Sequence, residues 1–165
     1  MSIEQHRKAA LASVRCFVLT ISDTRTEADD ISGDTIVGLL GANGHEVRLR
    51  ALVKDDPAAV QHALRANLGV AQVVITTGGT GITSRDSTYE AMSRLLDKRL
   101  DGFGELFRML SFQEVGSAAM LSRACAGTIG RTAVFSLPGS EHAVRLAMTR
   151  LILPELGHVV RELSR

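Results

Sequence analysis

The stretch from residue 71 to residue 92 constrains the fold of this chain more than any other. It begins with an apolar run at residues 71–75, passes through residues 78–81, where three of four positions are glycine, and ends in a helical pattern at residues 87–92. β-Branched apolar residues are typical of a strand buried on both faces, and glycines let the backbone turn sharply after it. The order of strand, glycine loop and helix therefore predicts a βα unit.

The loop of this unit is rich in hydrogen-bond donors. Hydroxyl groups accompany the glycine amides at Thr76, Thr77, Thr80, Thr83 and Ser84. Donors grouped at the start of a helix can hold an anion such as a phosphate. Asp86 follows directly, and a carboxylate next to a phosphate is repelled unless a metal ion or a ligand donor lies between them.

A purely structural interpretation of the same loop stays open. The glycines can serve packing alone, and Asp86 can act as a helix cap with a favourable dipole contact. Ser87 and Glu90 have the spacing of a capping box, which predicts that the helix begins here. The loop matches neither GxxxxGK[ST] nor GxGxxG, so the common nucleotide-binding fingerprints are absent.

Strand and helix patterns alternate along the chain, without repeats or a linker. Strands are predicted at residues 16–21, 45–53, 71–75 and 132–137, and helices at residues 35–40, 58–68, 87–100, 105–112 and 115–126. Gly102 and Gly104 are expected to break the helix that reaches residue 100. A last helical stretch is expected to begin with Ser140 as its N-cap, to be kinked or restarted at Pro154 and to end at residue 163. This alternation predicts one α/β domain, a three-layer αβα fold with a mostly parallel sheet. We expect residues 1–13 to form an N-terminal arm, or a short helix that docks on a neighbour, and residues 14–165 to form the domain.

Three predicted strands end in polar or glycine-rich segments, residues 22–26, 78–86 and 138–140. Ligands of parallel sheets bind beyond the C-terminal ends of the strands, so we expect these segments to converge on one anionic ligand. The first of them is expected to continue as a long polar loop to residue 34. Asp56 precedes Pro57 and is expected to cap a helix, which leaves Asp55 as the better functional candidate.

Composition excludes several classes of function. A net charge of +1, 4% aromatic residues and no tryptophan argue against a surface for nucleic acid or anionic membrane. No apolar run is long enough to span a membrane and no signal peptide is visible, so a cytoplasmic protein is expected.

Cys16, in a predicted strand, and Cys125, in a predicted helix, are expected to be buried free thiols. The five histidines lack the spacing of zinc ligands.

Five ordered motifs, together covering about residues 14–160, resemble the molybdopterin-binding family. They are Ile21-Ser22-Asp23-Thr24, Thr76-Thr77-Gly78-Gly79-Thr80-Gly81 with Arg85-Asp86, Gly102-Phe103-Gly104-Glu105, Met120-Leu121-Ser122-Arg123 and Leu137-Pro138-Gly139-Ser140. The family includes molybdopterin adenylyltransferases and the G domain of gephyrin-like proteins. The segments at residues 29–33 and 103–112 are similar to the subgroup called molybdenum cofactor biosynthesis protein B.

The resemblance implies a reaction in which AMP from Mg-ATP is attached to the terminal phosphate of molybdopterin and pyrophosphate is released. It implies catalytic roles for Asp55, Asp86 and Ser122, with the two aspartates as Mg²⁺ ligands. Substrate-binding roles are expected for Ser22, Asp23, Thr77, Gly78, Gly79, Thr80, Gly81, Arg123, Pro138, Gly139 and Ser140. It also implies a homotrimer or homohexamer, and the apolar residues within 103–112 suit a subunit interface.

Two alternatives to this enzyme remain. Lys54 stands where the adenylyltransferases usually carry proline, which keeps open a non-enzymatic carrier or scaffold that binds molybdopterin and hands it to later steps. The glycine loop by itself is also compatible with an unrelated binder of a sugar phosphate or a nucleotide. Turnover of ATP separates the enzyme from the carrier.

Overall fold

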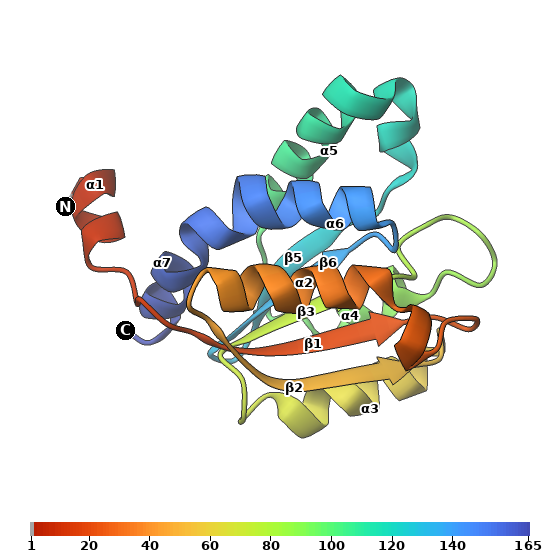
Figure 1. Cartoon of the computed structure of the whole chain (residues 1–165), viewed down its shortest axis with the longest axis horizontal. Helices are drawn as coiled ribbons and strands as arrows, with labels where there is room; N and C mark the ends of the chain where they lie inside the picture. Colours follow the sequence, from red (N-terminus) through yellow and green to blue (C-terminus); the bar gives the residue numbers. More distant parts are fainter. Residues whose placement is uncertain (1) are drawn as a thin grey trace.

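Six strands form one mixed sheet at the centre of the molecule (Figure 1). The structure is a computed structural model that describes residues 2–165, apart from the side chains of residues 6–8; Met1 of the predicted arm lies outside the described residues. The strands are β1 (Arg15–Ile21), β2 (Glu46–Val53), β3 (Val73–Thr77), β4 (Lys98–Arg99), β5 (Cys125–Ile129) and β6 (Thr132–Leu137). Their order is β2-β1-β3-β6-β5-β4; β2, β1, β3 and β6 are parallel, and β5 is antiparallel to both of its neighbours, β6 and β4.

Helices cover both faces of the sheet. They are α1 (Ile3–Lys8), α2 (Ile31–Ala42), α3 (Pro57–Asn67), α4 (Thr88–Leu95), α5 (Asp101–Val115), α6 (Glu141–Ala147) and α7 (Leu153–Leu163), with short 3-10 helices η1 (Glu27–Asp29) and η2 (Gly116–Leu121) and a π-helical turn, η3 (Met148–Ile152). In Figure 1, α2 and α6 lie on one side of the sheet and α3 on the other. None of the described helices combines the length and apolar character needed to cross a membrane.

The alternation of side chains along β1 builds two separate cores. Cys16 and Val18 point into a core shared with α2, α5, α6 and α7. Phe17, Leu19 and Ile21 point the opposite way, into a core shared with α3 and α4. Successive side chains of a strand face opposite sides, so a strand that is apolar throughout needs cover on both. The predicted three-layer αβα fold is therefore confirmed.

The N-terminal segment contacts the end of the chain. The amide of Leu11 donates to the carbonyl of Gly157 over 3.2 Å. A Cβ at residue 157 would lie only 2.1 Å from the Leu11 carbonyl oxygen, so glycine permits this approach to α7. The domain boundary between residues 13 and 14 stays a prediction.

Two predictions within residues 102–126 are wrong, although the helix expected at residues 105–112 is present as part of α5. Gly102 and Gly104 were expected to break a helix, but α5 runs through both. Glycine at position 104 instead allows α5 to approach β5, because a Cβ there would lie 3.1 Å from the carbonyl oxygen of Ala124. The predicted small-residue helix at residues 115–126 is the 3-10 helix η2 followed by β5, so Cys125 lies in a strand.

Two further boundaries differ from the predictions. The polar loop expected at residues 22–34 is shorter, because α2 already begins at Ile31. Asp30 accepts a hydrogen bond from the amide of Gly33 and so starts the helix earlier. The helix expected to reach residue 100 ends at Leu95, and β4 follows it as an edge strand.

Candidate functional site

The three predicted strand-end segments meet at one edge of the sheet. The Gly78 amide donates to the carbonyl of Leu137 over 3.0 Å, and the Thr77 hydroxyl donates to the carbonyl of Pro138 over 2.8 Å. On the other side, the Ser22 amide donates to the carbonyl of Val53 over 2.9 Å. Arg25 donates to the carbonyl of Gly139, and Arg85 donates to Asp23, so residues 22–26 contact both other segments. The expected convergence of residues 22–26, 78–86 and 138–140 is therefore confirmed as geometry.

The glycine loop, residues 78–86, needs glycine at its first two positions. Gly78 and Gly79 have φ angles of 107° and 69°, a region that other residues avoid. A Cβ at residue 78 would lie 2.0 Å from the carbonyl oxygen of Ile21, and one at residue 79 would lie 2.0 Å from the hydroxyl of Thr88. The loop therefore packs directly against the end of β1 and the start of α4.

Three backbone N–H donors of the glycine loop have no hydrogen-bond acceptor in this packing. Within the described part of the chain, the amides of Gly79, Thr80 and Gly81 donate to no protein acceptor. The far end of the loop is instead closed on itself, because Asp86 Oδ2 accepts from the Thr83 hydroxyl over 2.6 Å and from its amide over 2.9 Å. Three consecutive amides beside a helix start can serve an anion.

Asp55 lies against this loop from the end of β2. Its Oδ1 accepts from the Ser87 hydroxyl over 2.7 Å and from the Ser87 amide over 3.2 Å. The predicted capping box is therefore wrong, because the Ser87 hydroxyl bonds to Asp55 and Glu90 pairs with Arg123. The predicted role of Asp56 is confirmed: its carboxylate caps α3 through the Ala59 amide.

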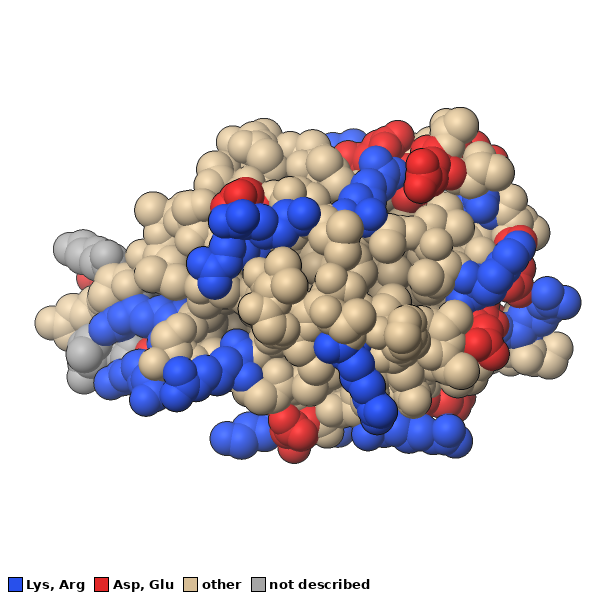
Figure 2. All heavy atoms as spheres, turned by 90° about the horizontal axis from the view of Figure 1, so that it is seen from below, with Lys and Arg blue, Asp and Glu red and all other residues tan. Residues whose placement is uncertain are grey.

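Asp23 joins the first two strand ends to the loop. Its Oδ1 accepts from the Asp55 amide over 3.1 Å, and its Oδ2 accepts from the guanidinium of Arg85 over 2.9 and 3.0 Å. The hydrogen bond from Arg85, followed by that from Asp55, lowers the pKa of Asp23. Lys54 donates to the carbonyl of Asp23. The strand ends lie on the right in Figure 1, and at the same end in Figure 2 basic and acidic side chains lie next to one another.

Ser122 and Arg123 reach the site from the segment between η2 and β5. Arg123 donates to the carbonyl of Gly81 through Nε over 2.9 Å and Nη2 over 2.6 Å, which ties β5 to the glycine loop. Ser122 lines a neighbouring cavity of about 190 Å³ together with Pro138 and Ser140. The Ser140 hydroxyl also caps α6 as predicted, by accepting from the Ala143 amide.

Sequence reasoning missed three residues that hold the last strand exit. The carbonyl of Gly139 accepts from Arg25 over 2.6 Å and from the Ser32 hydroxyl over 2.7 Å. Asp30, which is 1% exposed, accepts from the Thr20 hydroxyl and lies within 3.9 Å of Arg25. The polar composition of residues 22–34 marked this region, but no local pattern specified contacts with residue 139.

Asp30 is a buried carboxylate with several donors. Burial by itself would raise its pKa, but hydrogen bonds from Thr20, Arg50 and the amide of Gly33 outweigh burial and hold the pKa below its usual range. Arg50 donates to Asp30 Oδ2 over 3.0 Å and to the more exposed Asp34 over 2.6 Å. Asp30 is therefore charged in the folded protein and fixes the start of α2.

The acidic side chains do not form a preorganised metal cage. Among the described residues, no three His, Cys, Asp or Glu side chains are grouped as a metal site. Asp55 and Asp86 each use one carboxylate oxygen in the hydrogen bonds above, which leaves a second oxygen on each. One or two carboxylate oxygens are enough to bind Mg²⁺ when phosphate oxygens of a substrate and water molecules supply its other ligands.

Comparisons with known proteins agree along the whole chain. The family described as a probable molybdopterin binding domain matches residues 17–158. Molybdenum cofactor biosynthesis protein B from Bacillus cereus is 56% identical over all of this chain and 99% of its own length. A crystal structure of a molybdenum cofactor biosynthesis protein B is 58% identical and has a TM-score of 0.90, covering 93% of this chain and 97% of that one. A tungsten cofactor synthesizing protein from Pyrococcus furiosus is 41% identical with a TM-score of 0.86, covering 94% and 100%.

Proposed function

This chain belongs to the molybdenum cofactor biosynthesis protein B family of molybdopterin-binding domains, and on that premise we propose that it binds molybdopterin and adenylylates it. In the proposed reaction, a phosphate oxygen of molybdopterin attacks the α-phosphorus of Mg-ATP. A bond forms between this oxygen and phosphorus, the bond to the β-phosphate oxygen breaks, and pyrophosphate leaves. The open amides of the glycine loop are the observation that carries the proposal.

These amides give the molybdopterin phosphate a place to bind. The N–H groups of Gly79, Thr80 and Gly81 have no acceptor among the described residues, and the positive φ angle of Gly79 turns the backbone at the start of α4. A phosphate held by fixed backbone donors needs no rearrangement of the protein when it reacts, which is how positioning lowers a barrier. The Gly81 carbonyl accepts from Arg123, so this acceptor within the loop already has a partner.

Asp55 and Asp86 suit the metal of Mg-ATP. Transfer of a phosphoryl group requires charge neutralisation more than acid–base chemistry, and Mg²⁺ supplies that charge when it is bound. Asp55 Oδ2 lies 2.9 Å from the position of a Cβ at Gly79, and Asp86 Oδ2 lies 2.8 Å from one at Gly81, so both carboxylates border the loop. In this proposal they orient the nucleotide phosphates.

The cavity beside Ser122 suits the ring system of the substrate. Its walls include the apolar side chains of Phe107 and Leu146, and its polar groups come from Ser122 and Ser140. Binding sites for flat heterocycles combine apolar walls with a few fixed polar groups. We assign Ser122 to orienting the pterin, since its hydroxyl oxygen accepts only a long hydrogen bond, 3.4 Å, from the Ala124 amide.

A product assay tests the proposal. Purified protein is incubated with molybdopterin and Mg-ATP, and adenylylated molybdopterin and pyrophosphate are quantified. We expect equal amounts of both products, and none when Mg²⁺ is chelated. Binding of molybdopterin without any consumption of ATP would support the carrier instead, a role that Lys54 favours because it stands where the adenylyltransferases usually have proline.

We also propose that the chain forms a homotrimer, or a hexamer of two trimers, through α5 and η2. These elements carry a run of exposed large apolar side chains: Leu106, Met109, Phe112, Val115, Met120 and Leu121. Exposed apolar patches of this kind mark protein interfaces. In Figure 1, α5 projects from the body of the molecule.

Replacing Phe112 by Glu should dissociate this oligomer. Phe112 is 61% exposed in the single chain, so the substitution spares the core and places a charge in the interface. Multi-angle light scattering should change from a trimer or hexamer to a monomer, whereas Ile82→Glu, at a similarly exposed position in the glycine loop, should leave the mass unchanged. A monomeric wild type at micromolar concentration would contradict the proposal.

A further inference from the structure

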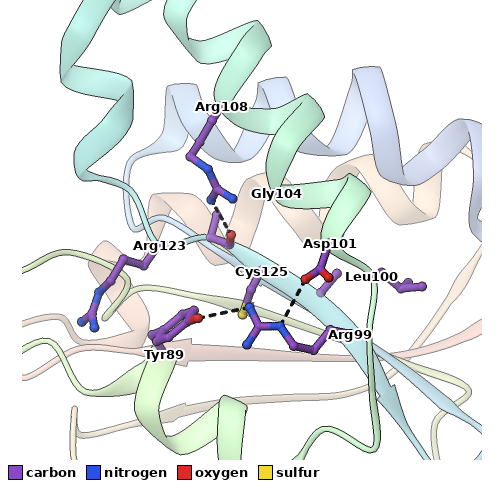
Figure 3. Close-up of a pocket in the computed structure, with 10 residues that line it drawn as sticks. Tyr89, Arg99, Leu100, Asp101, Gly104, Arg108, Arg123 and Cys125 are labelled. Carbon is purple, nitrogen blue, oxygen red and sulfur yellow. Dashed lines mark hydrogen bonds and ion pairs between the residues drawn. The ribbon is translucent and has the colours of Figure 1, made fainter.

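A second cavity lies on the other side of the Ser122–Arg123 segment. It has a volume of about 210 Å³ and is formed by residues of α4, β4, α5 and β5. Figure 3 shows Arg108 reaching down from α5 and Arg99 lying opposite it, with Cys125 between them. Arg123 closes the side next to Tyr89, with its guanidinium turned toward the glycine loop.

The charges around this cavity do not balance. Arg99 pairs with Asp101, and Arg123 pairs with Glu90. Arg108 has no carboxylate partner among the described residues; its Nη1 donates to the carbonyls of Ala124 and Ser122. Three guanidinium groups and two carboxylates leave one positive charge in excess.

The three arginines act on one small region. Burial raises the pKa of the Cys125 thiol, while the charges of Arg99, Arg108 and Arg123 each oppose this effect. Tyr89 is enclosed by two of them, with the guanidinium carbons of Arg99 and Arg123 at 5.5 and 5.2 Å from its ring centre. A guanidinium that keeps N–H groups free presents a planar fork to the oxygens of phosphate.

Behind the cavity wall the sheet is also polar. Ser136 is the register partner of Cys125 on β6 and is 1% exposed. Its hydroxyl has no hydrogen-bond partner in the part of the chain that the structure describes. A buried polar group without a partner is costly, and this one lies next to Cys125, which lines the cavity, so it adds to the polar character of the surroundings.

We propose that this cavity is a binding site for a small inorganic oxyanion of the phosphate class, held between Arg99 and Arg108. The site is distinct from the glycine loop and does not depend on the proposed adenylylation. Arg123 lies in both, since it borders the cavity and holds the Gly81 carbonyl. An anion in the cavity would therefore act on the glycine loop through the side chain of Arg123.

Tyr89 lines this cavity, and the chain contains one tyrosine and no tryptophan, so protein emission reports on the cavity and on the adjoining Arg123. We expect this emission to change and saturate as inorganic phosphate, or in a separate arm pyrophosphate, is added to the intact protein. Arg108→Gln and Arg99→Gln should each weaken binding about 10- to 100-fold, since one charge-assisted hydrogen bond contributes roughly 1.5–3 kcal/mol. The anion that binds with the higher affinity shows whether the cavity takes one phosphate group or two.

Arg131→Gln is the matched control. It removes the same charge from an exposed residue in the turn between β5 and β6 and should leave the titration unchanged. Arg108→Gln can disturb the contact between α5 and β5, so Arg99→Gln, at a more exposed side chain, gives an independent result. An unchanged Tyr89 emission in the wild type would overturn the proposal. Equal titrations of Arg99→Gln, Arg108→Gln and Arg131→Gln would overturn it as well.

Discussion

Asp55→Asn and Asp86→Asn should each lower the rate of molybdopterin adenylylation by about a hundred- to a thousand-fold, the effect of losing one contact to the charge of a transition state. Both substitutions keep an oxygen in place, so the bonds to Ser87 and Thr83 can persist. The melting temperature should therefore change little. Steady-state release of pyrophosphate and thermal unfolding of the same samples measure the two effects.

Two controls separate catalysis from structure. Asp56→Asn makes the same chemical change at the next residue, and because asparagine is an equally good N-cap for α3, rate and stability should both stay near the wild type. Ser87→Ala removes one bond to Asp55 and should cost about 1 kcal/mol of stability with a small effect on rate. If Asp55→Asn and Asp86→Asn lose no more activity than Asp56→Asn, the carboxylates have no part in the reaction.

Asp30→Ala should destabilise the fold by about 3 kcal/mol, the lower end of the cost of breaking a buried ion pair. The substitution leaves the Thr20 hydroxyl, the Gly33 amide and the Arg50 guanidinium without their shared acceptor. The loss is limited because Arg50 is partly exposed and keeps Asp34. A chain of this size should then melt roughly 6–12 °C lower, at about 2–4 °C per kcal/mol.

The difference between wild type and Asp30→Ala should depend on pH. The folded protein holds the pKa of Asp30 below that of the unfolded chain, so the stabilisation is complete above the unfolded value of about 3.9. It is lost as the pH falls through the lower, folded value. Asp34→Ala, which removes an exposed partner of Arg50, should cost less than about 1 kcal/mol. Denaturant unfolding that shows equal losses for both variants would contradict the role of Asp30.

The strands and caps that were predicted correctly depend on local sequence. The apolar runs of β1, β3 and β6 are buried on both faces, and Asp56 and Ser140 cap helices whose first residues follow them directly. These features need only a few neighbouring residues to specify them. The convergence of the strand ends also followed from sequence, because parallel strands end at a common edge.

The errors arose where distant residues decide the structure. β5 is made of small residues that also suit a helix, and it becomes a strand by pairing with β6. Gly104 permits contact with β5 rather than breaking α5. Arg25 and Ser32 reach Gly139 across more than a hundred residues of sequence, and Ser87 bonds to Asp55 in preference to capping α4. No local pattern contains these partners.

The most direct test of the proposed site is a crystal structure of the protein with molybdopterin bound. We expect the terminal phosphate to lie within hydrogen-bond distance of the amides of Gly79, Thr80 and Gly81, with the pterin in the cavity beside Ser122. A phosphate bound elsewhere, with these amides still without an acceptor, would contradict the assignment of the glycine loop as the phosphate site.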